Sequence, residues 1–191
     1  VVQALAPHTR VCIDTRNAAV AAACLRAGAQ VINDVTGLED PEMCAVSADA
    51  RAVVVMHSRG TPESMGGMTS YNQVVHDVRD QLLERASRAR CAEVWLDPGI
   101  GFAKTAAQSL RLLGQLDSLV STGLPVYLGA SRKSFIGHTL GLSDPADRLT
   151  GSLAAAAAGY AHGARAFRVH DVRETRELLD MLRAIDDARR G

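Results

Sequence analysis

The chain alternates between short apolar segments and longer segments with helical periodicity. The apolar segments are continuous rather than interrupted by polar residues, which is typical of parallel strands covered on both faces. Six such strands are predicted, at residues 11–13, 30–32, 52–56, 94–96, 125–128 and 166–169. Helices are predicted at residues 1–6, 18–27, 71–89, 105–120, 146–162 and 173–188, with a short one after Asp40-Pro41. This order of strands and helices indicates an α/β fold.

Three of the connections from a helix to the next strand have the same form. Each helix ends at a glycine, Gly28, Gly123 or Gly163, and an apolar strand follows within a few residues. Glycine adopts the left-handed conformation that ends many helices. The repetition predicts six βα units in one parallel sheet.

The polar residues at the ends of the strands favour one class of α/β fold. The residues that follow the six strands are Asp14, Asn33, His57, Asp97, Lys133 and His170. An open sheet gathers its ligand contacts at one switch point, whereas a (β/α) barrel brings every strand end to a common mouth. No Gly-x-Gly-x-x-Gly motif follows the first strand, which disfavours a dinucleotide-binding sheet. We predict a TIM (β/α)8-type barrel with about six parallel βα units, forming one domain over residues 1–191.

The segment Glu93–Lys104 holds the strand end with the most distinctive sequence. Its apolar strand runs into Asp97 and stops at Pro98, because proline lacks an N–H group and disfavours a helical residue before it. Gly99 and Gly101 then allow the backbone to approach whatever lies above the strand. A single aspartate here could simply cap the next helix. The polar residues at the other five strand ends favour a ligand site instead.

Composition narrows the possible partners and compartments. The 191 residues are 47% hydrophobic, enough for one core, and 21 basic residues balance 21 acidic ones. Nucleic acid and anionic membranes are therefore disfavoured as partners. The longest apolar run, Leu153–Ala158, is too short to span a bilayer. Four scattered cysteines without Cys-x-x-Cys spacing predict free thiols and a cytoplasmic protein.

The strand-end residues suggest two kinds of ligand group. One set offers hydrogen-bond acceptors: Asp14, Asn33 and Asp97. It suits a flat heterocycle with a guanidine-like edge, since a carboxylate accepts two parallel N–H bonds. The other set offers cations and donors: Lys133, Arg168 and His170. It suits an anionic leaving group such as diphosphate, although Lys133 and Arg168 could also be solvated charges at the rim.

The remaining polar residues near the strand ends have simpler interpretations. His57 is predicted to be a structural histidine, and Asp34 and Asp171 to be loop or helix caps. His57, Asp97 and His170 could together ligate a metal at a barrel mouth, but no spacing specifies such a site. No Ser–His–Asp arrangement is present.

Six motifs together resemble the successive strand-end motifs of the dihydropteroate synthase family, in that family's order and spacing. They are Ile13-Asp14-Thr15, Ile32-Asn33-Asp34-Val35, Met56-His57, Leu96-Asp97-Pro98-Gly99-Ile100-Gly101-Phe102, Ser131-Arg132-Lys133-Ser134-Phe135 and Arg168-Val169-His170-Asp171-Val172. The resemblance implies a transferase of folate biosynthesis. Its reaction condenses 6-hydroxymethyl-7,8-dihydropterin diphosphate with p-aminobenzoate to 7,8-dihydropteroate and diphosphate. The resemblance also implies Mg²⁺ as cofactor, a homodimer and competition by sulfonamides.

The resemblance also implies roles for individual residues. Asp14, Asn33, Asp97 and Lys133 would hold the pterin ring, with Asp97 on its 2-amino and N3 edge. Arg168 and His170 would hold the diphosphate, and Phe102 and Ser134 would border the aminobenzoate pocket. The full set of implied substrate contacts is Asp14, Asn33, Met56, Asp97, Phe102, Gly129, Lys133, Ser134, Arg168, Val169 and His170. Lys133, Arg168 and His170 are the implied catalytic residues, and no metal ligand is implied within this chain.

The family's first two βα units have no counterpart in this sequence. The resemblance places the metal-binding asparagine and the mobile loops of the aminobenzoate site on those units. We therefore expect an N-terminally truncated piece of a longer protein, with open sheet edges at residues 11–13 and 166–169. The 191-residue chain alone is predicted to keep most pterin contacts and to be inactive or nearly so.

Two alternative functions are considered. A methyltetrahydrofolate-dependent methyltransferase domain shares the barrel and the pterin floor, but its loop after the seventh strand would resemble Ser-Asn-x-Ser-Phe, where Arg132-Lys133 stands here. A non-catalytic pterin-binding paralogue is the second alternative, and the absent units favour it. Helices 146–162 and 173–188 are the candidates for a dimer interface, since small residues in the first permit close approach.

Overall fold

The structure, a computed structural model, describes all residues 1–191. Its strands are β1 (Cys12–Asp14), β2 (Val31–Asp34), β3 (Ala52–Met56), β4 (Glu93–Asp97), β5 (Tyr127–Leu128) and β6 (Ala166–Phe167). Its α-helices are α1 (Val2–Leu5), α2 (Ala18–Arg26), α3 (Pro41–Val46), α4 (Val74–Ala86), α5 (Ala106–Gly114), α6 (Asp117–Val120), α7 (Ser134–Leu140), α8 (Leu149–Ala161) and α9 (Val172–Arg190). Three 3₁₀ turns complete the list: η1 (Ser47–Asp49), η2 (Met65–Gly67) and η3 (Pro145–Arg148). The predicted α/β fold is confirmed.

The strands are parallel and neighbour one another in chain order. β1, β2, β3 and β4 form one sheet in that order, and β5 pairs with β6. A bridge between Leu96 and Val126 joins β4 to the segment that leads into β5. The six strands thus form one continuous series, while β1 and β6 are not paired with each other. Closure of the predicted barrel is not seen in these residues.

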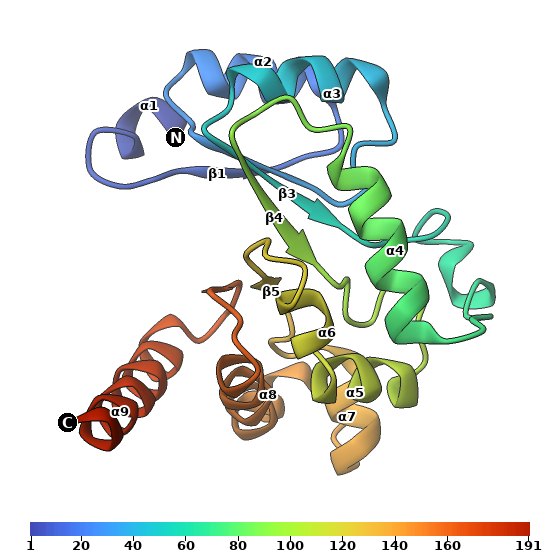
Figure 1. Cartoon of the computed structure of the whole chain (residues 1–191), viewed down its shortest axis with the longest axis vertical. Helices are drawn as coiled ribbons and strands as arrows, with labels where there is room; N and C mark the ends of the chain where they lie inside the picture. Colours follow the sequence, from blue (N-terminus) through green and yellow to red (C-terminus); the bar gives the residue numbers. More distant parts are fainter.

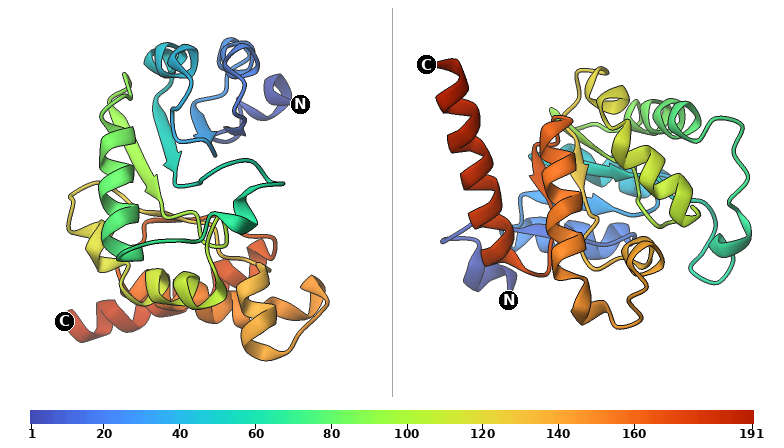
Figure 2. Two further views of the ribbon diagram at one scale, coloured as in Figure 1. Left: turned by 90° about the vertical axis from the view of Figure 1, so that its right-hand side faces the viewer. Right: turned by 90° about the horizontal axis from the view of Figure 1, so that it is seen from below.

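The helices lie around the strands on three sides. In Figure 1, α2 and α3 cover the strands from above, α4 lies to the right, and α5, α7 and α8 lie below. The side between the N-terminal helix α1 and the C-terminal helix α9 carries no helix in this view. The loop that follows β3 stands out from the rest of the chain (Figure 2). In Figure 1 the arrows of β3 and β4 point to the lower right, towards the side on which this loop lies.

The two faces of the strand series have different environments. Side chains alternate along a strand, and Ile32, Val53 and Leu96 point outwards into the main core of 27 buried residues. The inner face carries a smaller cluster that includes Val31 and Val54, and the rings of Trp95 and Tyr127 pack against this cluster. Continued to the strand ends, the same alternation places one set of residues on the inner face: Asp14, Asn33, Met56, Asp97, Gly129 and Arg168. All six are among the predicted substrate contacts.

Several predicted helix boundaries needed correction. The predicted helix 105–120 is two helices, α5 and α6, because the chain leaves helical geometry at Gln115 (φ −129°, ψ 33°). Gly114, just before the break, has low helix propensity. The predicted helix 146–162 begins as the 3₁₀ turn η3, and the predicted helix 71–89 is shorter at both ends as α4.

The local signals that end and begin helices are confirmed. Gly28, Gly123 and Gly163 all have positive φ, at 104°, 82° and 94°. Asn17 caps α2 by accepting a hydrogen bond from the Val20 N–H at 3.1 Å. The beginning of α5 is fixed by a capping box at Thr105 that was not among the predicted helix signals.

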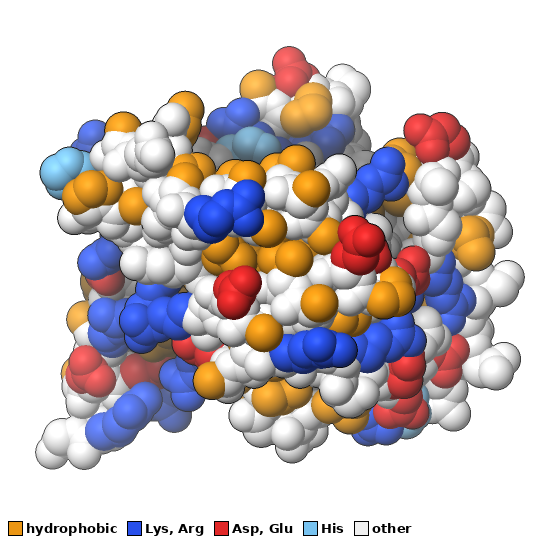
Figure 3. Space-filling view, turned by 90° about the horizontal axis from the view of Figure 1, so that it is seen from above, with side chains coloured by type: hydrophobic (Ala, Val, Ile, Leu, Met, Phe, Trp, Pro, Cys, Tyr) orange, Lys and Arg blue, Asp and Glu red, His pale blue; other side chains and the backbone are white.

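The surface is mixed in charge, in keeping with the balanced composition. Figure 3 shows basic and acidic side chains interspersed with hydrophobic ones on the face above α2 and α3. All four cysteines are free, as predicted. None of the helices has the length and apolar character needed to cross a membrane.

Candidate functional site

Asp97 lies at the centre of the site, at the end of β4. Its side chain is 3% exposed, and its Oδ1 accepts a hydrogen bond from the Gly99 N–H at 2.8 Å. Burial raises the pKa of this carboxyl group, while Lys133 and the Gly99 N–H oppose the rise. Asp97 accepts from the backbone of its own loop rather than from the first turn of α5. The simple helix-cap interpretation is therefore wrong.

Asn33 and Asp14 lie side by side on the two neighbouring strands. They are partners in the β1–β2 register. Asn33 is 3% exposed, and its Oδ1 is buried without a hydrogen-bond partner. A buried acceptor without a donor is costly, so this atom suits a ligand that brings an N–H group.

Arg168 connects the last strand end to the first. Its guanidinium lies 3.1 Å from the Asp14 carboxylate, and both side chains are about half exposed, at 55% and 43%. The pair spans from the end of β6 to the end of β1. It therefore places a cation beside Asp14, the register partner of Asn33.

Lys133 reaches from the loop after β5 to the loop after β4. Its Nζ donates a hydrogen bond to the Ile100 carbonyl at 2.7 Å and lies 4.7 Å from the centre of the Phe102 ring. Burial lowers the pKa of this amine, although Asp97 acts in the opposite direction. The amine thus lies between an aromatic ring and a buried carboxylate.

Gly129 leaves space where these groups meet. A Cβ atom at this position would lie 3.7 Å from Asp97 Oδ2 and 3.9 Å from Lys133 Nζ. A larger side chain would extend into the space between the carboxylate and the amine. The glycine keeps that space open to a ligand.

A cationic cavity of about 480 Å³ adjoins this point. It is lined by Gly129, Ser131, Arg132, Lys133, Pro145, Arg168, Val169 and His170. Within it, the Ser131 hydroxyl lies 3.1 Å from His170 Nδ1 and accepts a hydrogen bond from the His170 N–H at 3.2 Å. The cavity gathers the predicted diphosphate residues Arg168 and His170, as well as Val169.

Two predicted contacts are less directly placed. Met56 is 3% exposed and lies opposite Asp97 in the β3–β4 register, so its side chain forms part of the inner floor. Ser134 is exposed at the first position of α7 and has no side-chain hydrogen bond. Ser134 does not line the cavity.

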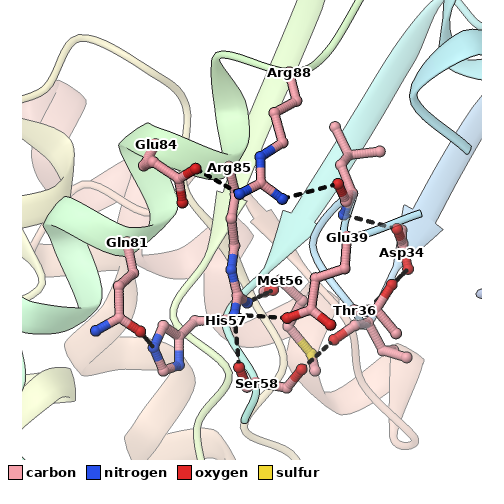
Figure 4. Close-up of polar contacts among 12 residues, drawn as sticks. Asp34, Thr36, Glu39, Met56, His57, Ser58, Gln81, Glu84, Arg85 and Arg88 are labelled. Atoms are coloured by element: carbon pink, nitrogen blue, oxygen red, sulfur yellow. Dashed lines mark hydrogen bonds and ion pairs between the residues drawn. The ribbon is translucent and has the colours of Figure 1, made fainter. Parts of the chain in front are cut away.

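His57 is fully buried behind the site, as predicted for a structural histidine. Its Nε2 lies 3.1 Å from Gln81 Oε1 (Figure 4), and its Nδ1 lies 2.9 Å from Lys104 Nζ. Since the Gln81 oxygen can only accept, the proton belongs on Nε2 and Nδ1 accepts from Lys104. Burial and the nearby Lys104 lower the pKa of His57 to about 2, so the ring is neutral.

The hypothesis of a metal site at His57, Asp97 and His170 is not supported. His57 has protein partners on both ring nitrogens. No group of three or more His, Cys, Asp or Glu side chains is arranged to hold a metal. His57, Asp97 and His170 therefore do not form a metal site.

The two aspartates predicted as caps have different roles. Asp34 is confirmed as a loop cap: its carboxylate accepts from the Thr36 N–H at 2.9 Å and the Leu38 N–H at 2.8 Å. Asp171 precedes α9 but caps nothing with its side chain. Its carboxylate instead binds the Arg132 guanidinium through two hydrogen bonds, because the loops after β5 and β6 lie together.

Sequence reasoning missed two buried cations below the site. Arg85 of α4 donates to the carbonyls of Met56 and Ser58, and pairs with Glu39 (Figure 4). Lys104 is 8% exposed, and burial lowers the pKa of its amine to about 7. Arg85 could have been found, because it continues the apolar stripe of Val78 and Leu82 at helical spacing.

Backbone strain is concentrated in the same loops. Only three non-glycine residues have positive φ: Leu38, Ala103 and Arg132, at 61°, 49° and 56°. They lie after β2, β4 and β5. Such conformations persist where surrounding contacts determine them, and they gather at functional sites.

Residues 1–170 match the family described as "Pterin binding enzyme". The chain belongs to this family. It is 40% identical over 182 residues to the dihydropteroate synthase of Synechocystis sp., covering 92% of this chain and 63% of that sequence. It is also 39% identical over 194 residues to the inactive dihydropteroate synthase 2 of Mycobacterium bovis, covering 96% of this chain and 61% of that sequence. The chain thus spans less than two thirds of the length of these relatives.

Solved structures agree with the family assignment. The dihydropteroate synthase of Thermus thermophilus, in complex with 6HMPPP, superposes with a TM-score of 0.92 at 43% identity, covering 96% of this chain and 76% of that one. The same enzyme in complex with 4-aminobenzoate gives a TM-score of 0.92 at 42% identity, covering 96% and 77%. The resemblance inferred from the strand-end motifs is confirmed.

Proposed function

We propose that this chain carries the pterin and diphosphate sites of a dihydropteroate synthase. The observation that carries the proposal is the unpartnered Asn33 Oδ1, buried on the same inner face as Asp97 and beside a cationic cavity. A pterin offers N–H groups to the two acceptors, and its methylene diphosphate would extend towards Arg168 and His170. The comparison with the Thermus enzyme, solved with 6HMPPP and with 4-aminobenzoate, supports this choice of substrates.

The proposed reaction is a displacement at the pterin methylene carbon. The C–O bond to diphosphate breaks and its electron pair leaves with the diphosphate. A C–N bond to the amine of p-aminobenzoate forms, and the amine gives up one proton to water. Asp97 and Asn33 would orient the ring. Arg168, His170 and Lys133 would stabilise the charge that develops on the diphosphate, which is the main contribution that such a site can make.

The fold context supports the proposal. We propose that the six parallel units are part of a TIM (β/α)8 barrel, since the strands follow one another in chain order and the polar residues meet at their carboxyl ends. The implied homodimer, Mg²⁺ and sulfonamide competition remain predictions. Oxygen atoms of diphosphate are the usual partners of Mg²⁺ at such sites, and the proposed displacement relies only on side chains of this chain.

The two alternatives make different predictions. A methyltransferase domain has no need for the cavity that Lys133, Arg168 and His170 line, so diphosphate binding argues against it. A non-catalytic paralogue has a relative in the inactive Mycobacterium bovis protein. Turnover by the 191-residue polypeptide would exclude that alternative and would also contradict our prediction that this chain alone is inactive.

Calorimetric titration with a dihydropterin tests the proposal. Asp97→Asn keeps the side-chain shape and removes the charge, and we expect affinity to fall by about tenfold or more, the value of a charge-assisted hydrogen bond. Asp187→Asn, at an exposed position of α9, is the matched control and should bind as the parent does. Equal affinity of the Asp97 variant and the parent, or no binding by a folded parent chain, would overturn the proposal.

A further inference from the structure

The chain has only two lysines, and both bind the same loop. Of its 21 lysine and arginine residues, only Lys104 and Lys133 are lysines. Lys104 donates to the carbonyls of Gly99 and Phe102, and Lys133 donates to the carbonyl of Ile100. The loop after β4 is therefore held between two lysine side chains, one of which belongs to the proposed binding site.

Lys104 occupies a closely fitted position beneath this loop. Its Nζ lies 3.1 Å from Gly99 O, 2.9 Å from Phe102 O and 2.9 Å from His57 Nδ1. The His57 carbonyl oxygen is a more distant fourth neighbour at 3.5 Å. An ammonium group has three N–H donors, so the three nearest acceptors can each receive one. Because neutral His57 is itself fixed by Gln81, the amine is anchored to the end of β3 as well as to the loop.

The loop cannot move without moving the site. Gly99 has φ +62°, and a Cβ there would lie 1.8 Å from the His57 carbonyl oxygen, so the loop rests directly on the end of β3. The Gly99 N–H donates to Asp97, and Ile100 and Phe102 supply the carbonyl and the ring that contact Lys133. A shift of this loop would displace three contacts of the proposed ligand groups.

An arginine could not replace Lys104 with the same contacts. A guanidinium donates in one plane as a rigid fork, whereas an ammonium donates in three directions from one atom. The acceptors around Lys104 come from three residues in two separate segments of the chain. The use of lysine here, in a chain that otherwise uses arginine, agrees with this requirement.

We propose that Lys104 is a positioning residue that fixes the loop Gly99–Phe102 and, through Ile100 and Phe102, holds Lys133 in its place beside Asp97. Lys104 itself does not contact the ligand. Its effect on pterin binding rests on the proposed function, whereas its effect on the position of Lys133 does not. The two effects are therefore measured separately.

The position of Lys133 can be observed directly, because only two lysines contribute signals. In protein grown with ¹³C,¹⁵N-lysine, Lys133→Met removes one side-chain signal set and so assigns both. In Lys104→Met without ligand, we expect the Lys133 signals to shift and to lose the ring-current effect of Phe102. Unchanged Lys133 signals in a folded Lys104 variant would overturn the proposal, whatever the protein binds.

The second readout is dihydropterin affinity, measured in a double-mutant cycle of Lys104→Met and Lys133→Met. If Lys104 acts through Lys133, each single change to Met weakens binding, and the double variant binds no more weakly than Lys133→Met alone. Additive losses would mean that Lys104 acts by another route and would overturn the proposal. A parent that binds no pterin, with the Lys133 shift present, would contradict the proposed function and leave the positioning role standing.

The variant Arg85→Met is the control for the loss of a buried cation as such. Arg85 is as buried as Lys104, at 8% exposed for each, but donates to Met56 and Ser58 rather than to the loop after β4. We expect its variant to be destabilised and to keep the Lys133 signals unchanged. If Lys104→Met does not fold, Lys104→Gln, which retains two N–H donors without charge, is measured in the same way.

Discussion

At the scale of single residues, the candidate site depends on a neutral histidine that lies behind it. His57 can serve as an acceptor for Lys104 only while its Nδ1 is unprotonated, and its Nε2 is already committed to Gln81. The pKa of His57 is lowered from 6.5 to about 2. The acid sensitivity of the fold should therefore depend on this ring.

The sign of that dependence follows from proton linkage. Between about pH 2 and 6.5 the unfolded chain binds a proton at His57 that the folded chain does not, so stability falls as the pH falls. In His57→Asn, which keeps an acceptor for Lys104, this contribution is absent. We expect the stability difference between parent and variant to fall by up to about 1.4 kcal/mol per pH unit below pH 6. Urea unfolding at several pH values measures it, and parallel pH profiles would contradict it.

Single residues also show what the sequence could and could not predict. The placement of Asp97 and Asn33 at one edge of the sheet was predictable, because each stands at the end of an apolar strand and parallel strands bring their carboxyl ends together. The burial of Lys104 was not, because its partner His57 lies at another strand end, 47 positions away in sequence. Asp171 was misassigned for the same reason, since its partner Arg132 lies 39 residues away.

At the scale of elements, α8 packs against the strands more closely than a helix with ordinary side chains could. A Cβ at Gly159 would lie 2.3 Å from Leu128 Cδ2 and 3.3 Å from Phe167 Cε1. The small residues of helix 146–162 indicated in the sequence that a neighbour could approach closely, but not that Gly159 makes the contact with β5 and β6. That information depends on how β5 and β6 lie beneath the helix.

Two glycine-to-alanine changes separate packing from helix propensity. Gly159→Ala adds a methyl group to the filled contact, and we expect a loss of about 1–3 kcal/mol in stability, typical of overpacking. Gly114→Ala, at an exposed position of α5 with open space around its Cβ, should instead stabilise by up to about 1 kcal/mol. Thermal unfolding of both variants tests this. Stabilisation by Gly159→Ala would show that α8 has room to move.

At the scale of the whole molecule, the order of the strands was predictable and their extent was not. Continuous apolar segments with glycine-ended helices indicated six parallel units, and the structure has them in chain order. The last two strands are only two residues long each. An apolar segment in the sequence does not show how many of its residues pair with a neighbouring strand. The loops were the hardest part of the structure to predict from the sequence, because the contacts between loops join segments that are far apart along the chain.

The two ends of the strand series meet through one exposed ion pair. Arg168 after β6 and Asp14 at the end of β1 lie 3.1 Å apart, yet both are about half exposed, at 55% and 43%. Exposed pairs contribute little to stability. We therefore expect Arg168 to contribute little to the stability of the fold.

Replacing this arginine should separate the two roles. Arg168→Gln is expected to change the free energy of unfolding by less than about 1 kcal/mol while weakening diphosphate binding by about tenfold. Affinity should also become less sensitive to salt, because one cation of the cavity is gone. Arg173→Gln removes another exposed, ion-paired arginine, on α9 outside the cavity, and should leave diphosphate affinity unchanged. Calorimetry at two salt concentrations measures both variants. A large loss of stability in Arg168→Gln would mean that the pair holds the ends of the strand series together, and unchanged affinity would remove Arg168 from the site.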